Sequence, residues 1–135
     1  MKTLIAEDDF GSRVMLQEIF EEYGDVHVAT NGREAIDAAR AAIDTHEPYD
    51  LICLDIIMPE VDGQEALRQI RDLERTRGLP FSQCSKVFMT SAVNTSKNIL
   101  RAFNSSCDAY LVKPLDVGSS SRNCANRDLL EGLRA

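Results

Sequence analysis

The sequence predicts an α/β fold in which a five-stranded parallel sheet is wound on both faces by helices. Short runs of strand-forming residues recur along the chain, at positions 3–6, 26–29, 51–54, 87–90 and 109–112. The segments between these runs repeat apolar residues at the spacing of a helix. Strand and helix therefore alternate, and this alternation is typical of a parallel sheet covered by helices.

Each segment between or after the strands carries the apolar face of one helix. Asn31-Gly32 and Asp62-Gly63 precede the second and third of these faces, and the Asn and Asp side chains suit a helix N-terminus. Packing in the core is sufficient to explain all five faces. In chain order the faces comprise Met15, Ile19 and Tyr23 with Leu16 and Phe20 beside them; Ile36, Ala39 and Ile43; Ala66, Leu67, Ile70 and Leu73; Ile99, Leu100 and Phe103; and Leu129, Leu130 and Leu133.

Three connections are longer than a compact strand–helix unit requires. They span positions 44–49, 77–85 and 115–126, and the last contains Gly118-Ser119-Ser120-Ser121. The apolar pattern resumes after each connection, so we interpret all three as surface insertions, with a partner contact as the more specific alternative. Because 135 residues at 44% hydrophobic content are enough for one core, we predict a single domain over residues 1–135.

The charge balance excludes some classes of partner. The chain has 15 basic and 22 acidic residues, and its net charge of −7 repels nucleic-acid phosphates and anionic membrane surfaces. No apolar stretch has the length of a signal peptide or a membrane span, so we expect a cytoplasmic protein with no membrane insertion and no direct nucleic-acid binding. Cysteines 53, 84, 107 and 124 match no metal-binding spacing, and we expect free thiols, with Cys53 in the core.

The most informative polar residues stand where the predicted strands end. In open parallel sheets this carboxyl edge binds ligands, above all where the strand order reverses. With the strand order 2-1-3-4-5, the first and third strands are neighbours at that reversal, so Glu7 and Asp8 should face Asp55. The polar residues that follow the strands are Glu7-Asp8-Asp9 after the first, Asp55 after the third, Thr90-Ser91 after the fourth and Lys113 after the fifth.

Carboxylates gathered in this way call for a cation. Two like charges about 5 Å apart repel by roughly 3 kcal/mol at an effective dielectric constant near 20. Mg²⁺ suits the position better than Ca²⁺, because Mg²⁺ binds through one or two carboxylates and favours a phosphate oxygen. Zn²⁺ is disfavoured because no His or Cys accompanies the acids. Any one of these acids alone would be read as a solvated loop charge, but the set of acids, hydroxyl and lysine indicates phosphoryl transfer.

These motifs together resemble the signature of response-regulator receiver domains. The resemblance covers residues 1 to about 116, and the elements follow one another in the expected order. It implies a flavodoxin-like, three-layer αβα fold and a single receiver domain over residues 1–135 with no effector domain. The matching elements are Glu7-Asp8-Asp9, Leu54-Asp55-Ile56-Ile57-Met58-Pro59, Asp62-Gly63, Thr90-Ser91-Ala92 and Tyr110-Leu111-Val112-Lys113-Pro114.

The resemblance also implies a role for each site residue. Asp55 would be the phosphoacceptor, and Mg²⁺ would be held by Asp8, Asp55 and the carbonyl of Ile57, with Glu7 acting through water and Asp9 outside the first shell. Ser91 and Ala92 would bind the phosphoryl group, Lys113 would pair with it, and Tyr110 would be the switch aromatic. Pro59, Gly63 and Pro114 would be structural, with a cis bond between Lys113 and Pro114.

The same resemblance names partners by class. A histidine kinase or a histidine phosphotransfer protein would supply the phosphoryl group, and an unknown downstream protein would bind the face formed by the fourth helix, fifth strand and fifth helix. A phosphorylation-dependent homodimer is a further expectation. The chain departs from the family pattern at Ser106, where a glycine often stands, and in its extended connection after Pro114.

Two alternatives to a non-enzymatic switch share part of this pattern. A Mg²⁺-dependent phosphohydrolase of the haloacid dehalogenase type also uses an aspartate at a strand end as its nucleophile, but it has a second aspartate two residues later, where this chain has Ile57. A degenerate receiver would bind partners without being phosphorylated, and the intact acids, hydroxyl and lysine speak against it.

Overall fold

The computed structural model describes residues 1–91 and 96–112. The predicted fifth helix, the 115–126 connection, Cys124, Ala92, Lys113 and Pro114 lie outside the described residues. Strands and helices alternate as the sequence predicts. In chain order they are β1 (Lys2–Ala6), α1 (Phe10–Glu21), β2 (Asp25–Ala29), α2 (Gly32–Asp44), β3 (Leu51–Asp55), α3 (Gly63–Thr76), the 3-10 helix η1 (Phe81–Gln83), β4 (Lys86–Ser91), α4 (Ser96–Asn104) and β5 (Ala109–Val112).

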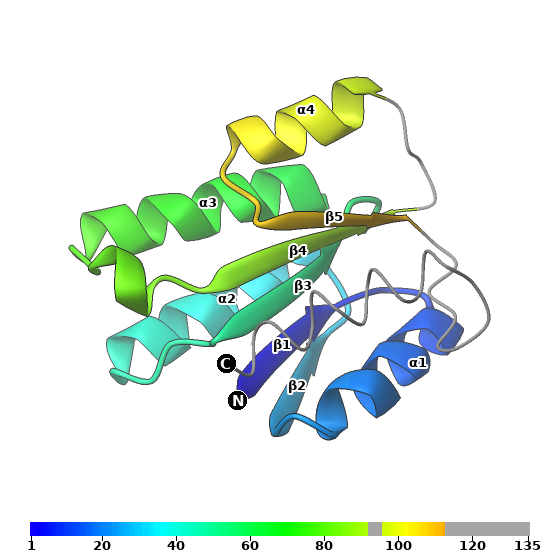
Figure 1. The fold of residues 1–135 in the computed structure, drawn as a ribbon, viewed down its shortest axis with the longest axis horizontal. Coiled ribbons are helices and arrows are strands. Elements are labelled where there is room, and N and C mark those ends of the chain that lie inside the picture. The colour runs from blue at the N-terminus through cyan, green and yellow to red at the C-terminus, as the bar shows by residue number, and fades with distance from the viewer. Residues whose placement is uncertain (92–95, 113–135) are drawn as a thin grey trace.

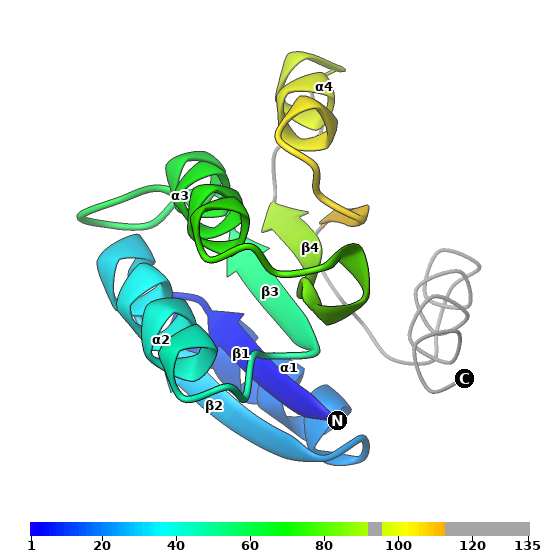
Figure 2. The same ribbon diagram turned by 90° about the vertical axis from the view of Figure 1, so that its left-hand side faces the viewer.

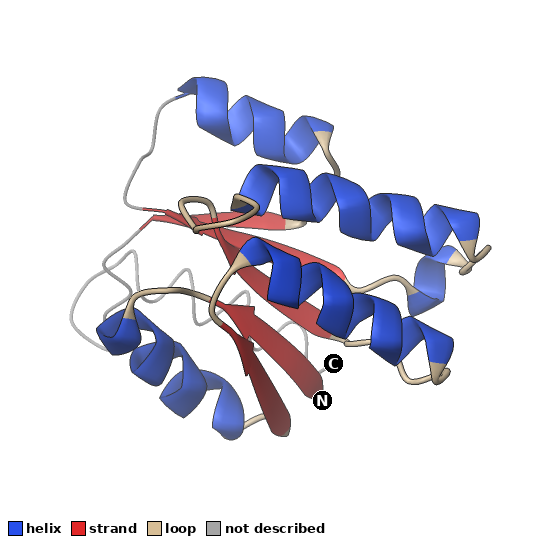
Figure 3. Ribbon diagram, turned by 180° about the vertical axis from the view of Figure 1, so that it is seen from behind, coloured by secondary structure: helices blue, strands red, loops and turns tan. Residues whose placement is uncertain are grey.

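The sheet confirms the predicted fold class. Its strands are parallel and lie in the order β2-β1-β3-β4-β5. Helices α2, α3 and α4 lie on one face and α1 on the other, so the described elements form three layers (Figures 1 and 3). Figure 2 shows α2 and α3 side by side along the sheet, where the two helices contact each other. Among the described helices, none combines the length and apolar character needed to cross a membrane.

The core has one part on each face of the sheet. Alternate residues of the central strands point to opposite faces, so β1 sends Leu4 and Ala6 toward α2 and α3 and sends Ile5 toward α1. Cys53 is fully buried on the α1 side, and the described cysteines Cys53, Cys84 and Cys107 are free thiols, as predicted. The α1 side also contains Leu16, Phe20, Leu51, Phe88, Ala109 and Leu111.

Two residues of the predicted apolar faces are exposed instead. Met15 is exposed because α1 packs on the sheet through the stripe formed by Leu16 and Phe20, which are four residues apart, and Met15 lies beside that stripe. Leu100 is exposed on α4, whereas Ala102 of the same helix is buried. Core packing was therefore the wrong interpretation for these two side chains.

Candidate functional site

The turn after β1 directs two consecutive acids to the carboxyl edge of the sheet. The backbone N–H of Glu7 still donates to the carbonyl of Ala29 at 3.0 Å, one residue beyond the end of β1. Asp9 then begins α1 as its N-cap, where its carboxylate accepts a hydrogen bond from the backbone N–H of Ser12 at 2.9 Å. The third acid of the motif is therefore occupied in capping the helix.

Asp55 ends β3 and is held by backbone contacts on both sides. The next residue, Ile56, donates its N–H to Thr90 of β4 at 3.0 Å and accepts a hydrogen bond from the N–H of Gly63 at 2.8 Å. A Cβ atom on Gly63 would lie only 2.1 Å from the carbonyl oxygen of Asp55, which leaves no room for a side chain. A glycine at this position lets α3 begin directly against the strand end, and Asp62 caps the helix through the N–H of Glu65 at 2.9 Å.

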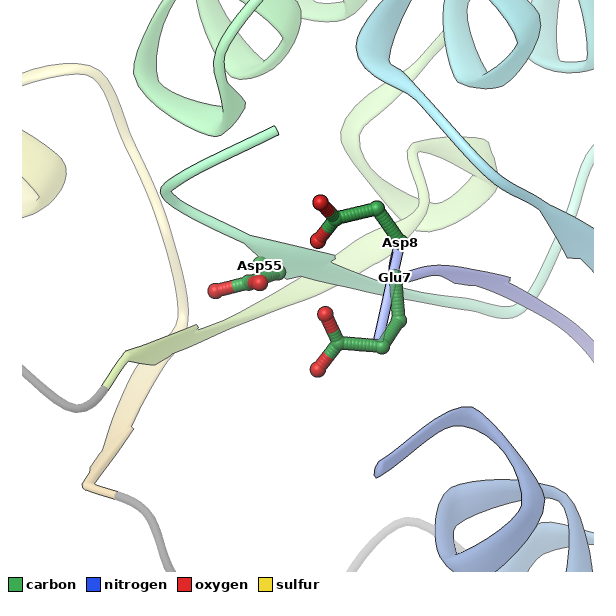
Figure 4. A group of neighbouring side chains, drawn as sticks. All are labelled: Glu7, Asp8 and Asp55. Atoms are coloured by element: carbon green, nitrogen blue, oxygen red, sulfur yellow. The ribbon is translucent and has the colours of Figure 1, made fainter. Parts of the chain in front are cut away.

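The three acids converge on one space. Each of Glu7, Asp8 and Asp55 contributes a carboxylate oxygen, and these oxygens lie within 4.8 Å of one another. Figure 4 shows the three side chains extending from the ends of neighbouring strands toward the same region. Glu7 is 0% exposed and Asp55 6% exposed, whereas Asp8 is open to solvent. The structure therefore brings together the acids that the strand order predicted to face each other.

This donor set fits Mg²⁺. All three candidate ligands are hard carboxylate oxygens, and none of the described His or Cys side chains belongs to the group. Burial of Glu7 and Asp55 removes the water that would otherwise screen their mutual repulsion, so a divalent cation would stabilise the arrangement. The exposed carboxylate of Asp8 leaves a solvent-facing side from which a hydrated ion could enter. The cluster can therefore hold a metal ion.

The structure also describes several other predicted site residues. Ser91 is the last residue of β4 and is buried, one residue beyond Thr90, which pairs with Asp55 across the sheet. Tyr110 is a partly buried residue of β5 that packs against the core on the α2–α4 side. Ile57 has a side chain that is 65% exposed, and Pro59 is exposed in the same loop. The predicted roles of Ser91 in phosphate binding, Ile57 in metal binding and Tyr110 in the switch stay predictions, as does the structural role of Pro59.

Sequence reasoning missed Arg13, which contacts the turn that carries two of the acids. Its Nη1 atom donates to the carbonyl oxygen of Glu7 at 3.0 Å, and its guanidinium lies 5.5 Å from the centre of the Phe10 ring. One signal was available in the sequence. A basic residue near the N-terminus of a helix opposes the helix dipole, and this unfavourable placement could have pointed to a local partner.

Comparison with known proteins identifies the class of the domain. The model of the response regulator receiver domain family matches residues 3–120. This match covers most of the chain, and the chain belongs to the response regulator receiver domain family.

Individual relatives that match the chain are named as response regulators. The chain is 35% identical to the "Response regulator Rre1" of Synechocystis sp. over 115 residues, which are 84% of this chain and 45% of that protein. It is 32% identical to the "Polar-differentiation response regulator DivK" of Brucella anthropi, over 84% of this chain and 85% of that protein. The chain spans about half the length of several other curated relatives that it matches.

Solved structures agree on the architecture. A two-component response regulator from Clostridium difficile superposes with a TM-score of 0.76 at 27% identity, covering 98% of this chain and 94% of the other. The receiver domain of the histidine kinase CKI1 from Arabidopsis thaliana, solved in complex with Mg²⁺ and BeF₃⁻, superposes with a TM-score of 0.78 at 24% identity, covering 96% and 89%. At that identity the second likeness is evidence for the fold.

Proposed function

We propose that this receiver domain is a phosphorelay switch that accepts a phosphoryl group on Asp55 in the presence of Mg²⁺. The observation that carries the proposal is the convergence of three carboxylates at the carboxyl edge of the sheet, with Asp55 at the end of the central strand β3. Family membership supports it, and so does the Mg²⁺ and BeF₃⁻ bound to a receiver of the same fold. Residues 1–135 would form a single cytoplasmic receiver domain.

Each residue of the pocket has a part in the proposed transfer. An oxygen of Asp55 forms a bond to phosphorus while the bond from phosphorus to the nitrogen of the donor histidine breaks. That nitrogen keeps the electron pair and takes a proton from solvent. Glu7, Asp8, Asp55 and the carbonyl of Ile57 would hold the metal ion, which when bound neutralises charge that develops on the phosphoryl oxygens. The hydroxyl of Ser91 would donate to one of those oxygens, and Lys113 would pair with them.

A protein donor fits the surroundings of the acids. Phe10 is 71% exposed and Ile57 is 65% exposed, and each lies within two residues of an acid in the sequence. A protein that docks over the acids would cover both of these apolar side chains. A histidine kinase or a histidine phosphotransfer protein would provide that surface and the phosphoryl group. Output would pass to a downstream protein or to a phosphorylation-dependent homodimer, and Tyr110 would take part in the switch.

Intact mass spectrometry tests the proposal. Incubation with acetyl phosphate and Mg²⁺ should add one acid-labile phosphoryl group, and borohydride reduction should convert the phosphorylated Asp55 to homoserine. The Asp55→Asn protein should accept none. Asp50→Asn is the matched control, because Asp50 lies directly before β3 at the opposite end of the same strand and should not affect labelling. Labelling that persists in Asp55→Asn, or none in the parent, would refute the proposal.

A further inference from the structure

Arg13 joins the first turn of α1 to the end of β1. Its backbone N–H donates to the carbonyl of Asp9 at 2.9 Å, which is an ordinary bond at the start of a helix. Its side chain turns back and donates from Nη1 to the carbonyl of Glu7 at 3.0 Å, while the guanidinium remains close to the Phe10 ring. The side chain is partly buried, so these contacts are shielded in part from competing water.

The carbonyl that Arg13 contacts belongs to the peptide that links Glu7 to Asp8. In an extended strand, consecutive side chains point to opposite faces, so Glu7 and Asp8 could not serve one ion there. Glu7 and Asp8 follow the end of β1 at Ala6, and their carboxylates meet there. The N–H of Glu7 remains bonded to Ala29, and Arg13 holds its carbonyl. The backbone N–H and the carbonyl of Glu7 therefore both have hydrogen-bond partners.

We propose that Arg13 is a positioning residue for the metal site: through the carbonyl of Glu7 it orients the Glu7–Asp8 peptide so that both carboxylates face one divalent cation. The inference deepens the proposed function and rests on it, because it names a residue that prepares the proposed Mg²⁺ site. Residues that orient metal ligands without contacting the metal typically lower metal affinity about 10–100-fold when they are removed.

Charge and position predict opposite effects, which makes the inference testable. A guanidinium near three carboxylates repels Mg²⁺, so if Arg13 acted through its charge alone, its removal would tighten Mg²⁺ binding. If Arg13 acts by orienting the Glu7–Asp8 peptide, its removal weakens Mg²⁺ binding although a repelling charge has gone. The sign of the change therefore separates the two roles.

The experiment is a calorimetric titration with Mg²⁺ alone, without a phosphodonor. We expect Arg13→Gln to raise the dissociation constant for Mg²⁺ about tenfold, which means weaker binding. Arg13→Lys, which keeps a donor and the charge, should recover part of the loss. Arg33→Gln is the matched control, because this substitution removes the same charge. Arg33 is exposed and lies in the first turn of α2. Arg33→Gln should leave Mg²⁺ affinity unchanged or slightly tighter. Circular dichroism and urea unfolding of each variant identify the folded fraction that is titrated.

The outcomes distinguish this inference from the function on which it rests. If the parent binds Mg²⁺ and Arg13→Gln binds it equally or more tightly, Arg13 does not position the site and the proposed function still stands. A parent that binds no Mg²⁺ at millimolar concentrations would overturn both. A loss in Arg13→Gln that Arg33→Gln reproduces would show that the effect does not depend on the contact with the Glu7 carbonyl, and it would overturn the positioning role.

Discussion

The two ends of the sheet both bury charged side chains, yet they arrange them differently. At the carboxyl end, Glu7 and Asp55 are buried beside Asp8, and all three carry the same sign of charge. At the amino end, Glu74 is buried against Arg71 of the same helix, with Asp108 on the other side of the guanidinium. The described acids of the first group share one sign of charge and suit a cation from outside, whereas the second group contains its own cation in Arg71.

The amino-end network joins three parts of the chain. Arg71 Nη1 donates to Glu74 at 2.8 Å and to the carbonyl of Ser85 at 2.7 Å, and Nη2 donates to Asp108 at 3.1 Å. Nε and Nη2 also donate to the carbonyl of Ser106, at 3.1 and 2.8 Å. Ser106 has φ of 70°, a conformation that favours glycine, so these bonds help to hold a serine in that conformation.

The comparison teaches how matched and unmatched charges are used in this fold. Where opposite charges are buried together with their hydrogen bonds satisfied, removal of one partner leaves an isolated charge and destabilises the protein. Where like charges are buried together, removal of one should relieve repulsion in the absence of metal. The amino end therefore stabilises the domain, and the carboxyl end is available for ligand chemistry.

The largest expected effect is at the amino end. Arg71→Met should lower the free energy of unfolding by about 3 kcal/mol, because the buried carboxylate of Glu74 loses its positively charged partner. Arg75→Met, four residues further along α3, is the matched control: the Arg75 side chain is 76% exposed against 17% for Arg71, and its loss should change stability by less than about 0.5 kcal/mol. Urea unfolding measures both. Equal losses of unfolding free energy in Arg71→Met and Arg75→Met would contradict the expectation that the buried pair contributes more than the exposed one.

The second effect is metal-dependent and belongs to the carboxyl end. Mg²⁺ at about one hundred times its dissociation constant should raise the stability of the parent by about 2.7 kcal/mol, since it binds the folded state. Asp8→Ala should abolish most of this gain and should be at least as stable as the parent in chelator, because one of three like charges has gone. Thermal unfolding over a Mg²⁺ series checks this. A parent that shows no Mg²⁺ dependence would contradict the metal assignment.

The third effect concerns the lifetime of the proposed phosphorylated form. The Ile57 side chain is exposed beside the acids and can neither donate nor accept a hydrogen bond, so it cannot orient a water molecule for hydrolysis. Ile57→Asn should speed dephosphorylation about tenfold, equivalent to about 1.4 kcal/mol in the transition state.

Phosphate release after removal of the donor measures that rate. Glu60→Gln, an exposed change in the same loop, is its control and should leave the rate unchanged. A parent that loses phosphate as fast as Ile57→Asn would show that another feature governs the rate.

The smallest effect is that of an exposed pair on α3. The hydrogen bond from Arg68, supported by Gln69, lowers the pKa of Glu65 to about 2. Because the pKa is depressed in the folded state, the contribution is present above the ordinary carboxyl pKa and is lost as the pH falls through about 2. Solvent screening limits it, and Glu65→Gln should cost about 0.3–0.5 kcal/mol at neutral pH. Urea unfolding at low and high salt tests this, and a salt-independent loss above 1 kcal/mol would contradict it.

Local patterns predicted most of the fold. The position of every described strand followed from short runs of strand-forming residues, and that of each described α-helix from its apolar spacing. The 3-10 helix η1 lies in the 77–85 connection and was not predicted. Met15 and Leu100 were assigned wrongly because spacing alone gives a broad stripe, and the angle at which a helix meets the sheet decides which edge of that stripe is buried. The adjacency of Glu7, Asp8 and Asp55 was predictable because strand order fixes which strand ends are neighbours.

The contacts that support each cluster were not predictable in the same way. Arg13 reaches back across a turn whose shape no periodicity specifies. Arg71 has partners at Glu74, Ser85, Ser106 and Asp108, which the chain separates by up to 37 positions and which meet because two connections fold against α3. Arg71 is also one of several arginines on α3, and its sequence neighbours do not mark it as the buried one.

The loop between β3 and α3 has a consequence for how this domain can vary. Gly63 lies against the carbonyl of Asp55, and a Cβ atom on Gly32 of α2 would lie 1.8 Å from the carbonyl oxygen of Val61. The loop is therefore fitted to its neighbours through main-chain atoms at both ends, while the Ile57 side chain between them faces solvent. Exchange of that side chain should leave the backbone path intact. On the proposed function, a single mutation at Ile57 would change the lifetime of the phosphorylated form without loss of the fold.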